Sequence, residues 1–406
     1  MKFAHPMFSK RSIFTLAFGT LAFASCVSSE PGNTGSDDPQ TDDTDVPTTN
    51  VCSGGHWTCK SHVQVDEHNR IRPFATPSGL GPADLTSAYK LNSAITSTAT
   101  IAIVDAFNYP NAESDLAKYR SQFGLSACTK ANGCLQILNQ SGAASPLPGK
   151  APAGDDWTVE AALDLDMASA ACPTCKLILF EAQDDEGDGL FIAQNAAAAA
   201  GAVSISNSWG GPSDGTDLTL DSQYFTHTQA VNVFVASGDS GNTGKKPDYP
   251  STSAKVIGVG GTHLVKASNA RGWTETVWNG AGSSCSKVIP KPGFQSVVPA
   301  SACANRAASD VSSVADPNTG VAVYNAGSGG FIVVGGTSAA SPFVAGVYAR
   351  YGISGASHDA SYAYSHTTQF FDITSGKNGT CGAPLCKSGA GWDGPTGIGS
   401  PNGAAL

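Results

Sequence analysis

Charged residues are scarce in this chain, and long hydrophobic runs are absent. Charged side chains make up 14% of the 406 residues, and the 23 lysines and arginines form no cluster of the kind that binds nucleic acid. The longest apolar stretches, Ile13–Ala24 and the alanine run Ala196–Ala200, are too short to be good membrane spans. Neither a phosphate-binding glycine loop nor an internal repeat is evident. These absences argue against a nucleic-acid partner, a nucleotide cofactor and a membrane-spanning fold.

Glycine, in contrast, is abundant, with 46 residues, and with the low charge this composition suits a secreted α/β enzyme better than a disordered chain. Short apolar segments alternate along the chain with longer helical patterns. Strands are predicted at Thr100–Asp105, Lys176–Phe180, Val203–Ser206 and Val231–Ala236, and helices at Glu113–Phe123, Trp157–Ala171 and Leu190–Ala200. The alternation predicts an α/β fold with a mostly parallel sheet and helices on both faces.

The first 26 residues predict a targeting segment, because Lys10 and Arg11 precede the apolar run. Ala22-Phe23-Ala24 suits an ordinary signal peptidase, whereas Phe23-Ala24-Ser25-Cys26 resembles a bacterial lipobox with Phe in place of Leu. Residues 27–50 carry six acids and no base, which predicts a disordered acidic linker. Residues 51–75 form a short N-terminal extension to the domain at 76–406. We therefore expect an extracytoplasmic protein, secreted or held at a membrane only by a lipid on Cys26.

The cysteine count supports an oxidising compartment. Of eleven cysteines, removal of Cys26 leaves ten, which fall into local pairs. Pairing by proximity predicts Cys52/Cys59, Cys128/Cys134, Cys172/Cys175, Cys285/Cys303 and Cys381/Cys386, although sequence does not fix connectivity. Cys172 and Cys175 could form a redox motif, but their place between a predicted helix and a predicted strand favours a local staple.

A glycine turn that opens into an apolar helix singles out Ser338. This serine stands in Gly335-Gly336-Thr337-Ser338-Ala339, ahead of a helical pattern at Phe343–Tyr351. Glycine lets a backbone approach a substrate closely, and the positive end of a helix favours an anionic oxygen, so a serine nucleophile is presented in this way. An ordinary turn with an N-cap gives the same local sequence, and the other residues must decide.

A serine nucleophile needs a base, and the usual base, histidine, is poorly placed here. None of the eight histidines lies in a His-Gly-Thr-His segment, and His227 and His263 look structural. The helical pattern at Trp157–Ala171 instead carries Glu160 and Asp164, four residues apart on one face. Because like charges repel, one carboxyl tends to hold a proton, and the pair can serve a serine at low pH. The competing interpretation, a solvated helix face, conflicts with the apolar residues around the two acids.

A third acidic position follows a predicted strand, in Ser237-Gly238-Asp239-Ser240-Gly241. Alone it could be any turn that contains an aspartate. Together with Ser338 and the Glu160/Asp164 pair, however, it completes a pattern that resembles the sedolisin family, the serine-carboxyl peptidases. Further segments in the family's order extend the resemblance over residues 73–406: Ile205–Gly210, Tyr249–Ser251, Val259–Thr262, Asp310–Ser312, Ala315–Pro317, Phe371–Gly376 and Gly391–Gly397.

The resemblance implies a role for each of these residues on a subtilisin-like, doubly wound fold. Ser338 is expected to be the nucleophile, Glu160 its general base, and Asp164 the carboxylate that orients Glu160 and shares its proton. Asp239 is expected to be protonated and to donate to the developing oxyanion, beside the Ser338 backbone N–H. The implied protein is a monomeric, acid-active endopeptidase that acts on proteins or peptides.

Secondary features follow from the same resemblance. Asp105, at the end of the first predicted strand, is expected to extend the proton-sharing network with Trp209. One calcium site is implied near the C-terminus, with carboxylates from Asp372 and Asp393, and the carbonyls of Ile373, Gly389 and Gly391 with a water completing six oxygens. Two acidic turns are the alternative interpretation of those segments.

One departure from the family concerns the N-terminal region. Sedolisins usually carry a long folded propeptide, and residues 51–73 are far too short to be one, so the resemblance is best to bacterial members that lack it. Two other functions stay open. An inactive relative that serves as a surface binding module conflicts with the intact set of four residues, and a neutral subtilisin-type protease conflicts with the absence of the His-Gly-Thr-His segment.

Overall fold

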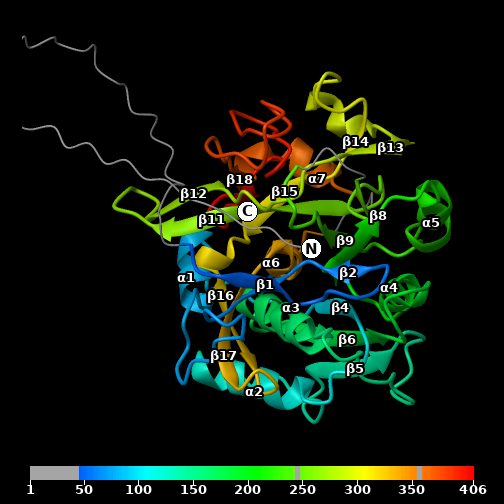
Figure 1. The fold of residues 1–406 in the computed structure, drawn as a ribbon, viewed down its shortest axis with the longest axis vertical. Coiled ribbons are helices and arrows are strands. Elements are labelled where there is room, and N and C mark those ends of the chain that lie inside the picture. The colour runs from blue at the N-terminus through cyan, green and yellow to red at the C-terminus, as the bar shows by residue number, and fades with distance from the viewer. Residues whose placement is uncertain (1–44, 243–246, 354–358) are drawn as a thin grey trace, which may run out of the picture. The chain divides into compact units, whose positions relative to one another are not determined.

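An eight-stranded sheet forms the centre of the protein, whose computed structural model describes residues 45–242, 247–353 and 359–406 (Figure 1). The strand order is β12-β11-β9-β7-β4-β6-β5, with β15 beside β11. All neighbours are parallel except β11 and β12. The strands are β4 (Thr100–Ala106), β5 (Leu135–Asn139), β6 (Lys176–Ala182), β7 (Ser204–Asn207), β9 (Asn232–Ala236), β11 (Ile257–Lys266), β12 (Trp273–Val277) and β15 (Val311–Val314). The four predicted strands correspond to β4, β6, β7 and β9, which confirms the mostly parallel sheet.

Helices cover both faces of this sheet. In the described residues they are α1 (Pro82–Ala88), α2 (Ala112–Gln122), α3 (Trp157–Ala171), α4 (Gly189–Ala199), α5 (Asp217–Tyr224), α6 (Thr337–Tyr351) and α7 (Ser361–Ser365). The helices α3 and α6 pack against each other, and α4 packs over β4, β6 and β7. Nearly every residue of β4 is buried, so side chains on both faces of the strand are covered. The three predicted helices correspond to α2, α3 and α4.

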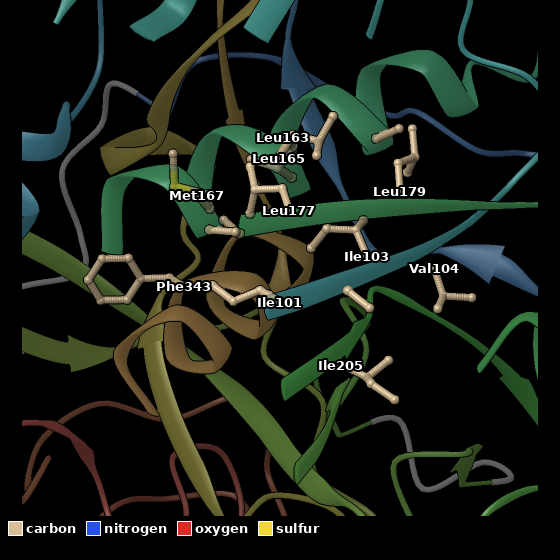
Figure 2. Packing of buried hydrophobic residues seen from close by; sticks show 14 of the residues in the cluster. Ile101, Ile103, Val104, Leu163, Leu165, Met167, Leu177, Leu179, Ile205 and Phe343 are labelled. Atoms are coloured by element: carbon tan, nitrogen blue, oxygen red, sulfur yellow. The ribbon is translucent and has the colours of Figure 1, made fainter. Parts of the chain in front are cut away.

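Aliphatic side chains fix α3 and α6 to the sheet. Figure 2 shows the buried residues that meet there: Ile101, Ile103, Leu163, Leu165, Met167, Leu177, Leu179 and Phe343. Full burial of a side chain of this kind stabilises the fold by about 1.5–3 kcal/mol. The packing matters for function because α3 carries Glu160 and Asp164, and α6 carries Ser338.

The N-terminal segment contributes strands to two smaller sheets. One is antiparallel, in the order β1-β3-β17-β16, and the other has the order β10-β8-β2. Their strands are β1 (Thr48–Asn50), β2 (Thr58–Cys59), β3 (His62–Gln64), β8 (Trp209–Pro212), β10 (Asp248–Tyr249), β16 (Val321–Asn325) and β17 (Gly330–Gly335). Two short pairs complete the described strands: β13 (Cys285–Pro290) with β14 (Asn305–Ala307), and β18 (Phe370–Phe371) with β19 (Ser400–Pro401). Short 3-10 helices lie at Gly293–Val297, Pro317–Thr319 and Thr367–Gln369.

The first described residues correct one prediction. The sequence predicts a disordered linker as far as Asn50, but residues 48–50 form β1, where pairing with β3 satisfies backbone groups. The targeting segment at 1–26 and the linker as far as residue 44 lie outside the described residues. Among the described helices, none is long and apolar enough to cross a membrane.

All five predicted cysteine pairs are disulfides in the structure: Cys52–Cys59, Cys128–Cys134, Cys172–Cys175, Cys285–Cys303 and Cys381–Cys386. Cys172–Cys175 connects the end of α3 to the start of β6, as a local staple would.

Candidate active site

Ser338 lies in the first turn of α6, directly after β17. The helix begins at Thr337 because Gly336, with a φ of 104°, turns the chain sharply, and a Cβ there would collide with the Lys60 carbonyl oxygen and with Asp239 Oδ2. Pro342 lacks the N–H that would bond the Ser338 carbonyl in a regular helix. The Ser208 hydroxyl oxygen lies 3.4 Å from that carbonyl oxygen. Ser338 is therefore held at the positive end of a helix, in a conformation that only glycine at 336 allows.

Glu160 and Asp164 lie one turn apart on α3, and both are completely buried. The Ser61 hydroxyl donates to Glu160 Oε2, and the Ser208 hydroxyl donates to Asp164 Oδ1 at 2.8 Å. The other oxygens of the pair, Oε1 and Oδ2, have no donor among the described residues. The structure thus excludes the solvated helix face that the sequence left open.

Burial raises the pKa of both acids. For Asp164 the charges of Asp105 and Glu160 raise the pKa further, and for Glu160 the hydroxyls of Ser338 and Ser61 partly oppose the effect of burial. The Ser338 hydroxyl itself donates to the Ser208 carbonyl oxygen, at 3.1 Å. A proton shared between Glu160 and Asp164 would satisfy their two free oxygens, and a rotation of the Ser338 side chain would direct its hydroxyl to Glu160.

Asp239 follows β9 and is directed at the turn that carries Ser338. Its Oδ1 accepts from the backbone N–H and the hydroxyl of Thr337, both at 2.8 Å. Its Oδ2 is buried without a hydrogen-bond donor among the described residues, and His62 Nε2 lies 3.7 Å from it. Burial raises the pKa of Asp239, while His62 lowers it. A protonated Oδ2 is consequently free to donate to a substrate oxygen beside Gly336.

Asp105 joins this cluster differently from the prediction. Both of its carboxylate oxygens are buried and lack donors in the described chain, and burial followed by the charge of Glu160 raises its pKa. The Trp209 indole, however, donates to the Val104 carbonyl at 3.1 Å rather than to Asp105. Asp105 therefore acts on Glu160 and Asp164 through its charge, and the expected link to Trp209 is wrong because the indole N–H is used by the neighbouring carbonyl.

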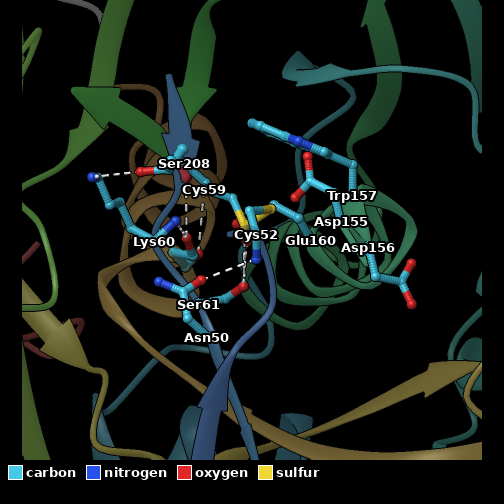
Figure 3. Close-up of a disulfide and its surroundings, with 12 residues drawn as sticks. Asn50, Cys52, Cys59, Lys60, Ser61, Asp155, Asp156, Trp157, Glu160 and Ser208 are labelled. Carbon is cyan, nitrogen blue, oxygen red and sulfur yellow. Dashed lines mark hydrogen bonds between the residues drawn. A yellow bond between two sulfur atoms is a disulfide. The ribbon is translucent and has the colours of Figure 1, made fainter. Parts of the chain in front are cut away.

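The segment that contains Lys60 and Ser61 runs across this cluster, a feature that the sequence did not reveal. The Ser338 N–H donates to the Lys60 carbonyl oxygen at 2.9 Å, and the Lys60 N–H lies 3.0 Å from the Ser338 hydroxyl oxygen and donates to the Ser208 carbonyl oxygen at 3.0 Å. Figure 3 shows Lys60 and Ser61 beside Glu160 and Ser208, with the Cys52–Cys59 disulfide next to them. No local motif marks Lys60 or Ser61; only the disulfide loop and the following strand place them here.

The two predicted calcium carboxylates are brought together. Asp393 is buried, its Oδ1 accepts from the Thr396 N–H and hydroxyl, and its Oδ2 has no donor among the described residues. Asp372 is exposed and accepts from the Gly391 N–H at 2.9 Å. Burial raises the pKa of Asp393 to about 7, and the charge of Asp372 contributes. A free buried oxygen beside a second carboxylate fits a hard cation. The carbonyls of Ile373, Gly389 and Gly391 stay a prediction.

Comparisons with known proteins identify the family of this chain. The model of the subtilase family matches residues 154–363. Kumamolisin from Bacillus sp. (strain MN-32) is 32% identical over 370 residues, which cover 82% of this chain and 64% of that protein. Sedolisin from Pseudomonas sp. (strain 101) is 30% identical over 383 residues, which cover 83% of this chain and 62% of that protein. This chain thus spans less than two thirds of the length of either relative.

A solved structure extends the likeness to three dimensions. It is titled as Pseudomonas sedolisin, a serine-carboxyl proteinase, complexed with two molecules of pseudo-iodotyrostatin. The alignment has a TM-score of 0.67 at 28% identity, and it covers 81% of this chain and 97% of that chain. Since the family model matches half of the chain, and both the relatives and the fold agree with sedolisin, the chain belongs to the subtilase family, in its sedolisin group.

Proposed function

We propose that this protein is a serine-carboxyl endopeptidase that hydrolyses peptide bonds in proteins or peptides at acidic pH. The observation that carries the proposal is a cluster of three buried carboxyl groups around the turn that presents one serine: Glu160 interacts with the Ser338 hydroxyl, and Asp239 bonds to the adjacent Thr337. Glu160 and Asp164 approach Ser338 from α3, and Asp239 approaches from the end of β9. The relatives kumamolisin and sedolisin support the same reaction, and a structure of sedolisin is described as a serine-carboxyl proteinase.

Each group has a defined part in acyl transfer. Ser338 Oγ attacks the substrate carbonyl carbon while Glu160 accepts its proton, and Asp164 holds Glu160 in place. The oxyanion forms between the Ser338 N–H and the protonated Asp239, and one such donor is worth a factor of about 10²–10³ in rate. The amine then leaves with the proton held by Glu160. Water hydrolyses the resulting ester with Glu160 again acting as the base, which releases the acid and regenerates Ser338.

The enzyme is expected to be active at acidic pH because two of its steps require protonated carboxyl groups. Asp239 donates only when protonated, and Glu160 and Asp164 can share a proton only while one of them holds it. Burial raises the pKa of all three groups, which widens the pH range in which these protons are present. As the pH rises through the raised values the protons are lost, so activity falls.

Calcium and the cellular location complete the proposal. Asp372 and Asp393, with nearby backbone carbonyls, would hold one calcium ion, and this ion would crosslink the C-terminal loops rather than take part in the reaction. The five disulfides support a position outside the cytoplasm, secreted or anchored through Cys26. The protein is proposed to act as a monomer.

The test is a pH–rate profile on a denatured protein substrate, run for the wild type, Ser338→Ala and Glu160→Gln. Each variant should lose at least ~10³-fold in turnover. Glu186→Gln, on an exposed side chain, is the matched control and should behave as the wild type. A Glu160→Gln enzyme with near-wild-type turnover would show that Glu160 is not the base.

The same experiment separates the alternatives. A maximum at neutral pH would favour a neutral subtilisin-type protease. A protein without turnover that also fails to react with a peptide aldehyde at Ser338 would be a binding module instead.

A further inference from the structure

Residues 58–64 lie in the candidate cleft in the manner of a bound substrate. Upstream of the Lys60–Ser61 bond the chain pairs antiparallel with β8, with Thr58 opposite Gly210 and Cys59 opposite Trp209. Downstream of that bond it pairs antiparallel with β17, with His62 opposite Gly335. A single extended strand therefore changes partner at Lys60–Ser61, and Ser338 lies at the change. Pairing of an extended peptide with the edge of a sheet is a general mode of peptide recognition.

The bond itself has the contacts that hydrolysis requires. The Lys60 carbonyl oxygen accepts from the Ser338 N–H at 2.9 Å, and the free Oδ2 of Asp239 lies at the same Gly336 turn. The Lys60 N–H donates to the Ser208 carbonyl, which fixes the plane of the peptide. On the other side of the bond, Ser61 contacts Glu160, the group that would return a proton to the leaving nitrogen. The carbonyl of Lys60 thus occupies the oxyanion position.

The side chain of Lys60 shows what the cleft selects. It is only 11% exposed, its stem passes Gly210, and its Nζ lies 3.0 Å from Asp248 Oδ2 and 3.2 Å from the Thr58 hydroxyl. Asp248 also borders an open cavity lined by Pro212, Ser237, Gly238, Asp239 and Gly282. A lysine or arginine pairs with this partly exposed carboxylate, whereas an apolar side chain leaves it without a cation and an acidic side chain repels it.

We propose that the cleft selects lysine or arginine on the acyl side of the scissile bond through Asp248, and that Lys60–Ser61 in the protein's own chain is the first such bond it cuts. This inference rests on the proposed peptidase function and names its substrate class. Ser338 Oγ forms an ester with the Lys60 carbonyl, the C–N bond to Ser61 breaks, and Glu160 passes the serine proton to the new amino group. Water then hydrolyses the ester, which leaves a Lys60 carboxylate and a free Ser338 hydroxyl.

The upstream side of the bond is held firmly enough to act as an inhibitor before cleavage. The Cys52–Cys59 disulfide closes the loop that leads to Lys60. Within that loop, the N–H groups of His56 and Trp57 donate to the Asp185 carbonyl, and the Trp57 ring packs on Phe191 and Trp209, with centroids 4.9 and 6.0 Å apart. Before cleavage, these contacts keep other peptides out of the cleft. The cut also separates residues 1–60, which include Cys26, from the peptidase body.

The first test follows self-cleavage of the full chain at acidic pH by intact mass and N-terminal sequencing. The wild type should yield a fragment that begins at Ser61, at a rate independent of protein concentration, and Ser338→Ala should stay intact. Lys60→Arg should keep the rate, whereas Lys60→Met and Lys60→Glu should slow it by at least ~10-fold. Melting temperatures and thiol counts confirm that each variant is folded with its disulfides.

A charge exchange ties the effect to Asp248. Asp248→Lys should slow cleavage of the wild-type bond and should restore cleavage when combined with Lys60→Glu. Hydrolysis of a denatured protein substrate is measured in parallel. A wild type that digests that substrate but keeps its own Lys60–Ser61 bond, or cuts it equally fast in Lys60→Glu, overturns this inference and leaves the proposed function intact. A chain that cuts neither contradicts the proposed function itself.

Discussion

Substitution of Asp239 gives the sharpest test of how the oxyanion is stabilised. Oδ1 is fixed by two hydrogen bonds from Thr337, each 2.8 Å long, so in Asp239→Asn the amide oxygen should keep these bonds and the amide nitrogen should take the place of Oδ2. The NH₂ group then donates to the oxyanion without needing a proton from solution. Asp239→Ala, in contrast, leaves only the Ser338 N–H as a donor.

The expected magnitudes follow from this geometry. Loss of one oxyanion donor costs about 10²–10³ in kcat, or about 2.7–4 kcal/mol, so Asp239→Ala should fall in that range. Asp239→Asn should lose at most ~10-fold at the acidic optimum, since a neutral donor of similar geometry remains. Its activity should also persist to higher pH than that of the wild type, until the proton shared by Glu160 and Asp164 is lost.

The assay is kcat/KM for one peptide substrate across the acidic to neutral range, with circular dichroism and melting temperature as controls for folding. The side chain of Asp239 is buried, so a loss of structure in the alanine variant has to be excluded first. Equal losses in the asparagine and alanine variants, with unchanged pH profiles, would refute the role of Asp239 as a proton-bearing donor.

Three further predictions concern stability, calcium and anchoring. Burial raises the pKa of Asp105, so the folded protein holds a proton that the unfolded chain releases. The free energy of unfolding should therefore fall as the pH rises above about 4, the ordinary pKa value for an aspartate. Thermal melts of Asp105→Asn should show a flatter decline, and an identical decline would contradict this cause. Chelation at about pH 8, above the raised pKa of Asp393, should lower the melting temperature of the wild type but not of Asp393→Ala; a wild type unaffected by chelator would argue against the site. With self-cleavage blocked by Ser338→Ala, the protein should be found in the membrane fraction and Cys26→Ser should release it, with no free thiol in either; soluble protein beginning at Ser25 would instead indicate ordinary signal-peptidase cleavage.

The sequence predicted the residues whose signal is local. Ser338 follows a glycine turn, Glu160 and Asp164 are spaced by one helical turn, and Asp239 ends a strand, so each is visible within a few residues. The disulfide partners are likewise close in sequence, the most distant being 18 residues apart. These patterns are set by backbone geometry that a short window of sequence contains.

Contacts between distant segments could not be predicted in this way. The pairing of β2 with β8 joins residues 58–59 to 209–210, and the pairing of β3 with β17 joins residues 62–63 to 334–335. Strand pairing of this kind depends on where the completed fold brings free strand edges together, which short extended segments do not encode by themselves. For the same reason Asp248 could not be identified from the sequence, although it directly precedes Tyr249–Ser251, one of the segments that resemble the sedolisin family.

The position of β3 inside its sheet has a consequence for the timing of activity. Because β3 follows the cut in the chain and pairs with β17, residues 62–64 remain part of the peptidase body after a cut at Lys60–Ser61 and keep the leaving-group half of the cleft filled. A strand tethered this closely competes with free peptide at an effective concentration on the order of millimolar. Dilute substrate therefore meets a closed cleft until that strand is exchanged or trimmed, and hydrolysis of other proteins should begin with a lag whose length is set by strand removal rather than by bond cleavage.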